Sequence, residues 1–214
     1  LIEQPENFNY IPEGAPNMSI SNWPEMRAYS NIPKQGQVSD SIAIDLMHGY
    51  YATVSYVDAL IGKILDELKE QKLDHNTIVI LVSDHGYNLQ EHTQWAKFTS
   101  YNTSTQVPLV IYNPFSKAKG TTNALTSLVD IYPTIAELCS LGVPENQLDG
   151  TSLAPVLNNP NLGGKSHVFI KKTNAFTIKT RDFSYTEFIK PKDNTIIDKM
   201  LYDHRISKVE NINI

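Results

Sequence analysis

The chain has 214 residues, of which 41% are hydrophobic, and it carries 18 basic and 23 acidic side chains for a formal net charge of -5. That apolar content is enough to build a core and excludes a disordered chain, and the length fits one domain with or without a small subdomain. The acidic balance argues against a nucleic-acid partner, and no apolar run approaches the roughly 20 residues that span a bilayer.

Residues 1 to about 38 are rich in proline, asparagine and serine. The prolines interrupt any long periodic pattern, so this stretch is predicted to be an extended surface segment and not a packed element. Because the chain begins with Leu1 and not with methionine, we expect the natural protein to have residues upstream of it.

A long helix is predicted next, beginning at Ser39 or Asp40 and running for about 30 residues. Its apolar face recurs at spacings of three and four, at Met47, Tyr50, Tyr51, Val54, Val57, Ile61, Ile64, Leu65 and Leu68. Two continuous apolar runs follow at residues 77–82 and 107–112. Such runs suit strands buried on both faces, which is typical of a central strand in a parallel sheet.

The first of these strands ends at Asp84, His85 and Gly86. Ligands of open α/β sheets bind outside the carboxyl ends of the strands, which is where these residues fall. A carboxylate beside an imidazole is a plausible part of a divalent-cation site, although an ion such as calcium wants six to eight oxygen ligands. The alternative is an ordinary cap or turn aspartate, so the tripeptide alone is a weak signal.

The remainder of the chain is predicted to contain one more helix and then several short strands. Asp130 is predicted to cap a helix, with Cys139 as a small core residue on its buried face. Short strand-like runs at residues 168–170, 176–178, 184–189 and 200–202 then suggest a small antiparallel sheet. His75 and His204 are interpreted as surface residues.

Several segments together resemble the sulfatase family of the alkaline-phosphatase superfamily, closest to its iduronate-2-sulfatase-like members. They are SDHGYNLQEHTQWAKFTSYNTSTQVPLVIYNP, YYATVSYVDALIGKIL, SLVDIYPTIAELCSLG, LDGTSLAPVL, IKTRDFSYTEFI and LYDHRISKVENINI. The resemblance covers roughly residues 39 to 214 and implies the C-terminal part of such a protein. It implies an α/β fold with part of an alkaline-phosphatase-like mixed or parallel sheet flanked by helices. On this basis residues 1–160 belong to the catalytic domain, and residues 161–214 form a small C-terminal antiparallel α+β subdomain.

The resemblance also assigns site residues. Asp84 and His85 match the family's second pair of metal ligands, the metal usually being calcium. Lys97 matches the lysine that contacts the sulfate group, where an ammonium stabilises charge in the transition state; the alternative is a solvated surface lysine. His92 is a candidate for the substrate pocket, with a structural loop role as the alternative. Family members often have glycine at Gln90 and Thr93, so the loop is expected to differ in shape.

The family's nucleophile is a formylglycine made from the Cys or Ser of a C/S-x-P-x-R motif, which this sequence lacks. We therefore expect the formylglycine and the first pair of metal ligands upstream of these residues, and we expect the chain alone to be inactive. The leading hypothesis is part of a sulfuric ester hydrolase acting on a sulfated small molecule or glycan. The alternatives are a phosphate- or phosphonate-ester hydrolase of the same superfamily and a non-catalytic truncated binding module.

The resemblance implies a secreted, periplasmic or lysosomal location, which no residue demonstrates. A missing companion segment would leave hydrophobic sheet surface uncovered. A companion chain that supplies the N-terminal part, or a homo-oligomer, is therefore expected as a partner.

Overall fold

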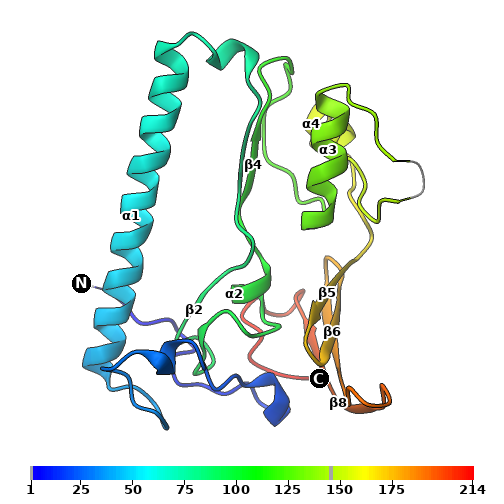
Figure 1. Cartoon of the computed structure of the whole chain (residues 1–214). Coiled ribbons are helices and arrows are strands. Elements are labelled where there is room, and N and C mark those ends of the chain that lie inside the picture. Colours follow the sequence, from blue (N-terminus) through cyan, green and yellow to red (C-terminus); the bar gives the residue numbers. More distant parts are fainter. Residues whose placement is uncertain (1, 145–146) are drawn as a thin grey trace.

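The computed structural model describes residues 2–144 and 147–214. The helices are α1 (Asp40–Glu70), α2 (Asn102–Thr105), α3 (Ile131–Leu138) and α4 (Ala154–Asn158), with 3₁₀ turns η1 (Asn17–Ser19), η2 (Met26–Ala28), η3 (Asp74–Asn76) and η4 (Leu128–Asp130). The strands are β1 (Val79–Val82), β2 (Asn88–Leu89), β3 (Trp95–Ala96), β4 (Leu109–Tyr112), β5 (Val168–Lys172), β6 (Ala175–Lys179), β7 (Phe183–Ile189) and β8 (Ile196–Asp203). Helix α1 runs along one side of the molecule, and the sheet of β5 to β8 lies on the other (Figure 1).

Helix α1 confirms the predicted long helix, with 31 residues and Ser39 as its N-cap. The Ser39 side chain accepts a hydrogen bond from the backbone N–H of Ile42, which satisfies one of the free donors of the first turn. The predicted apolar face is buried only near the start of the helix, at Met47. Farther along, Tyr56 and Ile64 are 66% and 67% exposed, so the described residues cover only the first part of the apolar face.

The N-terminal segment is packed, which corrects the prediction of an unpacked surface stretch. Eight buried side chains form one core: Trp23, Met26, Ile32, Val38, Ala43, Met47, Leu89 and Trp95. The first four come from this segment. Its prolines prevent a periodic pattern but do not prevent isolated apolar side chains from reaching a core.

Strands β1 and β4 confirm both predicted apolar strands, but they pair antiparallel, with Val79 opposite Tyr112 and Val82 opposite Leu109. The expectation of a parallel central strand is therefore wrong for this pair. Within the described residues the two strands form a two-stranded sheet with exposed apolar side chains, including Val110 at 58%. A β-branched run indicates a strand but carries no information about the direction of its neighbour.

The C-terminal strands confirm the predicted small antiparallel sheet, in the order β5-β6-β7-β8. Its core comprises Tyr101, Ala175, Phe188, Met200 and Tyr202. Because Tyr101 precedes α2, this core joins the sheet to the centre of the chain. The boundary predicted between residues 160 and 161 stays a prediction. No helix in residues 2–144 and 147–214 is both long and apolar enough to cross a membrane.

Two predictions around α3 need correction. The Asp130 carboxylate forms a capping box with Ser127 on η4, and it does not cap α3. It is fully buried and also accepts hydrogen bonds from Thr151 N at 2.8 Å and Lys165 Nζ at 2.6 Å. Cys139 is exposed because α3 ends one residue before it, so it is not a core residue.

Candidate functional site

The polar turn after β1 places two possible metal-ligand atoms side by side, a carboxylate oxygen of Asp84 and Nε2 of His85. Asp84 Oδ1 accepts a hydrogen bond from the backbone N–H of His85 at 3.0 Å, and Asp84 Oδ2 lies 3.6 Å from His85 Nε2. His85 Nδ1 lies 2.8 Å from the carbonyl oxygen of Gly86, which requires that Nδ1 carries the proton. The Nε2 lone pair is then free beside a carboxylate whose side chain is 83% exposed.

This arrangement fits one part of a cation site. A carboxylate oxygen and an imidazole nitrogen 3.6 Å apart are close enough to bind the same ion. The backbone contact to His85 Nδ1 is the kind of outer contact that orients a metal-binding imidazole. No group of three or more His, Cys, Asp or Glu side chains with metal-site spacing occurs in residues 2–144 and 147–214. Asp84 and His85 therefore supply two donors, and the six to eight ligands of a calcium ion need further residues.

Helix α2 connects the turn at Gly86 to the segment that carries Lys97. The backbone N–H of Gly86 donates to Ser104 O at 2.9 Å. A Cβ at Gly86 would lie 2.0 Å from the carbonyl oxygen of Thr103, so only glycine fits this close approach. The buried Asn88 amide donates to Ser104 Oγ at 2.7 Å and to the carbonyl oxygen of Ala96 at 2.6 Å.

The Lys97 side chain is partly enclosed, with 29% exposure. Its Nζ lies 3.3 Å from Glu25 Oε1, and Glu25 comes from the N-terminal segment. The ammonium therefore does not extend freely into solvent, and it faces a carboxylate in this structure. Contact between Lys97 and a sulfate group stays a prediction.

The geometry around His92 favours its structural interpretation over a place in the substrate pocket. The ring is 2% exposed, its Nε2 lies 2.9 Å from Val209 O, and it packs on Tyr101 with 4.7 Å between ring centroids. Burial lowers the pKa of the imidazole below its ordinary 6.5, which favours the neutral ring. His92 thus links the central loop to the C-terminal segment.

The loop carrying His92 has an unusual backbone. Gln90 and Thr93 have φ values of 83° and 62°, in the left-handed region that glycine adopts most easily. These are the two positions where family members often have glycine. Both residues therefore hold a glycine-like backbone at some cost in strain, and the expected difference in loop shape stays a prediction.

Sequence reasoning missed a cluster of buried charges beside α2. His204 was predicted to lie on the surface but is 8% exposed, and Lys179 and Glu210 are buried near it. Lys179 shares one face of β6 with the buried Ala175 and Thr177. That period-two placement of a lysine among inward-facing residues is the signal that was available from the sequence.

The family model for sulfatases matches residues 7–141, and the chain belongs to the sulfatase family. Mouse (Mus musculus) iduronate 2-sulfatase is 29% identical over 166 residues, covering 63% of this chain and 30% of its own length. Mouse arylsulfatase K is 30% identical over 210 residues, covering 92% of this chain and 38% of its own length. The chain thus spans about a third of the length of these curated relatives.

Solved structures agree with the family assignment. A protein solved in complex with its substrate D-glucosamine-2-N,6-O-disulfate is 31% identical, with a TM-score of 0.70 over 77% of this chain and 35% of that one. The phosphonate monoester hydrolase of Agrobacterium radiobacter is 27% identical, with a TM-score of 0.66 over 77% of this chain and 36% of that one. The chain has the predicted α/β, alkaline-phosphatase-like fold.

Proposed function

We propose that the protein carrying this chain is a sulfuric ester hydrolase that acts on a sulfated sugar. Asp84 and His85 supply half of a calcium site, Lys97 binds the sulfate group and assists catalysis, and the formylglycine nucleophile comes from residues outside this chain. The observation that carries the proposal is the hydrogen bonding through Ser104 and Asn88, which joins Gly86, the residue after His85, to Ala96, the residue before Lys97. The sulfated sugar bound by one solved neighbour supports the substrate class.

The chemistry of a sulfate ester suits these side chains. Its transition state spreads negative charge over the sulfuryl oxygens, and a fixed ammonium at Lys97 stabilises that charge. Glu25 Oε1 lies 3.3 Å from the ammonium, and a sulfate oxygen would take its place beside Lys97 when substrate binds. A bound divalent ion supplies Lewis-acid polarisation of the sulfate, and Asp84 and His85 would hold it.

A phosphonate- or phosphate-ester substrate is the second candidate, because a phosphonate monoester hydrolase is among the structural neighbours. Both substrates are tetrahedral anions, and the residues described here suit either. The nucleophile, which lies outside this chain, separates the two reactions chemically.

The exposed apolar residues of α1, β1 and β4 support a further part of the proposal. Val54, Tyr56, Ile64, Leu81 and Val110 are between 43% and 67% exposed. A surface of this kind marks an interface. We propose that it is covered by the sulfatase residues that the curated relatives have beyond this chain, as the same polypeptide or as a companion chain.

The test compares two substrates and one metal in the longest natural protein that carries these residues. Turnover of an aryl sulfate should exceed that of the matched aryl phosphonate by at least about 100-fold in kcat/KM and should stop on calcium removal. Calorimetric calcium binding should be lost in Asp84→Asn and retained in the control Asp66→Asn, an exposed aspartate of α1. Preference for the phosphonate would favour the second candidate. A folded protein without turnover of either ester would favour a non-catalytic binding module.

A further inference from the structure

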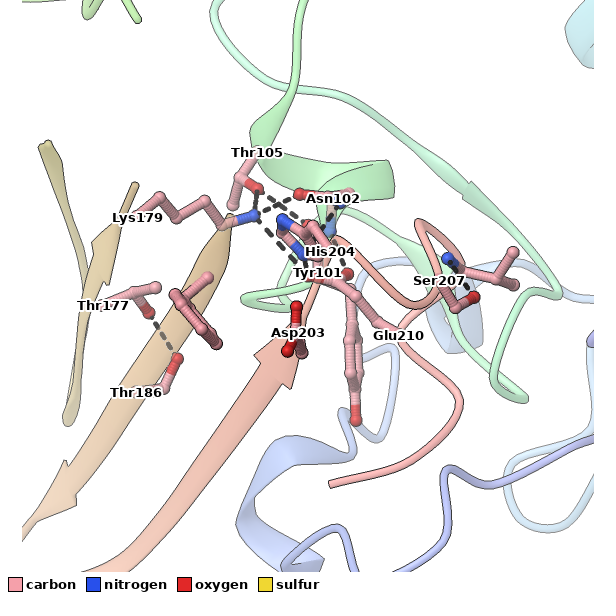
Figure 2. Close-up of polar contacts among 12 residues, drawn as sticks. Tyr101, Asn102, Thr105, Thr177, Lys179, Thr186, Asp203, His204, Ser207 and Glu210 are labelled. Carbon is pink, nitrogen blue, oxygen red and sulfur yellow. Dashed lines mark hydrogen bonds and ion pairs between the residues drawn. The ribbon is translucent and has the colours of Figure 1, made fainter. Parts of the chain in front are cut away.

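A cluster of buried and half-buried polar side chains joins the C-terminal part of the chain to α2 (Figure 2). We call it the α2 cluster; its members are Asn102, Thr105, Lys179, His204 and Glu210. The first two belong to α2, Lys179 ends β6, and the last two follow β8. None of the five matches a site residue implied by the family resemblance.

The contacts in the α2 cluster are short and enclosed. Lys179 Nζ donates to Asn102 Oδ1 at 2.5 Å and to Thr105 Oγ1 at 2.7 Å, and it lies 3.8 Å from Glu210 Oε1. Glu210 Oε2 accepts from the backbone N–H of Asn102 at 2.6 Å, and its Oε1 lies 3.1 Å from His204 Nε2. The side chains of Lys179 and Glu210 are only 10% and 2% exposed.

Buried charges of this kind stabilise only when both partners are present. Burial lowers the pKa of Lys179, while the carboxylate of Glu210 opposes that change. Without Glu210, the ammonium of Lys179 would be buried with no counter-charge. Without Lys179, the buried carboxylate of Glu210 would keep only His204 Nε2 and the Asn102 N–H as partners. The positions of Lys179 and Glu210 are therefore coupled to each other and to α2.

Helix α2 depends on such contacts because it is too short to be stable as an isolated helix. It has four residues, and isolated helices need about 12 to 15 residues even to be marginal in water. The position of α2 is held by the α2 cluster on one side and by the buried ring of Tyr101, the residue just before the helix.

The other side of α2 contacts the turn after His85 directly and the segment of Lys97 through Asn88. Ser104 O accepts from the N–H of Gly86, the residue after His85. Ser104 Oγ accepts from the Asn88 amide, which also donates to Ala96 O, the carbonyl just before Lys97. A shift of α2 therefore displaces the turn of the metal-ligand pair and the segment of the sulfate-binding lysine.

We infer that Lys179 and Glu210 are positioning residues: by fixing α2, they set the spacing between the Asp84–His85 pair and Lys97. They contact neither substrate nor metal. The catalytic consequence rests on the proposed function, whereas the structural consequence does not.

The experiment measures amide hydrogen exchange across residues 84–106, together with kcat and KM for an aryl sulfate, in the longest natural protein that carries this chain. Lys179→Met and Glu210→Gln should each raise the exchange rate of the Gly86 amide at least tenfold and lower kcat at least tenfold, with little change in KM. The double variant should recover part of both losses, because neither charge then remains unpaired. Lys190→Met, which changes an exposed lysine, should match wild type.

Unchanged exchange across residues 84–106 in folded single variants would overturn the inference. So would a double variant whose losses equal the sum of the single losses. If the single variants do not fold, Thr105→Val removes one acceptor of Lys179 with little change of shape, and the same exchange criterion applies to it. If the wild type hydrolyses no aryl sulfate, the proposed function fails, and the exchange measurement still decides the positioning role.

Discussion

The two ends of α1 differ in a way that separates the molecule into a closed and an open region. Near the helix start, Ala43 and Met47 are buried against Trp23 and Trp95. Beyond them, side chains at the same helical spacing are exposed, with Ile64 at 67%. The sequence pattern is one continuous apolar face along the helix. Periodicity therefore indicates which face of a helix is apolar, but it does not indicate which residues cover that face.

The loops of the candidate site lie beside this apolar core, and polar contacts hold them. Asn88, Lys179 and Glu210 are buried with hydrogen-bond partners drawn from segments far apart in the chain. The open region, formed by the later part of α1 with β1 and β4, presents apolar side chains (Figure 1). The comparison teaches that contacts within this chain hold the site-bearing loops, while the described residues leave the large apolar surface uncovered.

The largest expected effect contrasts Trp95, in the closed region, with Tyr56, in the open one. Trp95→Ala should lower the free energy of unfolding of this chain by about 3–5 kcal/mol, because it removes a fully buried ring. Tyr56→Ala should stay within about 0.5 kcal/mol, because the ring is 66% exposed. Urea unfolding followed by circular dichroism measures both.

The same pair of variants sharpens the comparison in a longer natural protein. If further sulfatase residues cover the open face there, Tyr56→Ala becomes destabilising by more than about 1 kcal/mol. Equal and large losses of unfolding free energy for Trp95→Ala and Tyr56→Ala in the 214-residue chain alone would contradict the division into a closed and an open region.

A smaller effect is expected for two glycines. Gly86→Ala should destabilise by about 1–3 kcal/mol, since its Cβ would lie 2.0 Å from a backbone oxygen of Thr103. Gly62→Ala in the open part of α1 meets no atom within 4 Å and should stabilise by about 0.5–1 kcal/mol. Thermal unfolding of the two variants measures both shifts. A stabilising Gly86→Ala would contradict the close packing of α2 on the turn after β1.

The sequence predicted much of the secondary structure, because helices, caps and strands depend mainly on residues that are close together in the chain. Helix α1 with its Ser39 cap and the four C-terminal strands follow from periodicity and capping chemistry. The antiparallel pairing of β1 with β4 and the burial of the N-terminal segment were missed, because both depend on contacts between distant residues.

Some residues of the candidate site could likewise be proposed from the sequence, and others could not. Asp84 and His85 stand at the end of a predicted strand and were proposed as metal ligands from their position and from the family resemblance; that role stays a prediction. His204 and Glu210 lie in an irregular tail, where no periodicity indicates burial, so their place beside α2 is visible only in the fold. The buried Lys179 was detectable in principle from its inward-facing register on β6.

The most direct test of the proposed sulfatase site is the kcat/KM for an aryl sulfate after Lys97→Met, in the longest natural protein that carries this chain. Lys63→Met, on the exposed surface of α1, is the matched control. If Lys97 faces the sulfate group, kcat/KM should fall by about 100-fold or more, with unchanged thermal stability and unchanged calcium binding. A folded Lys97→Met protein with the kcat/KM of wild type would contradict the assignment of Lys97 and the shared site built around it.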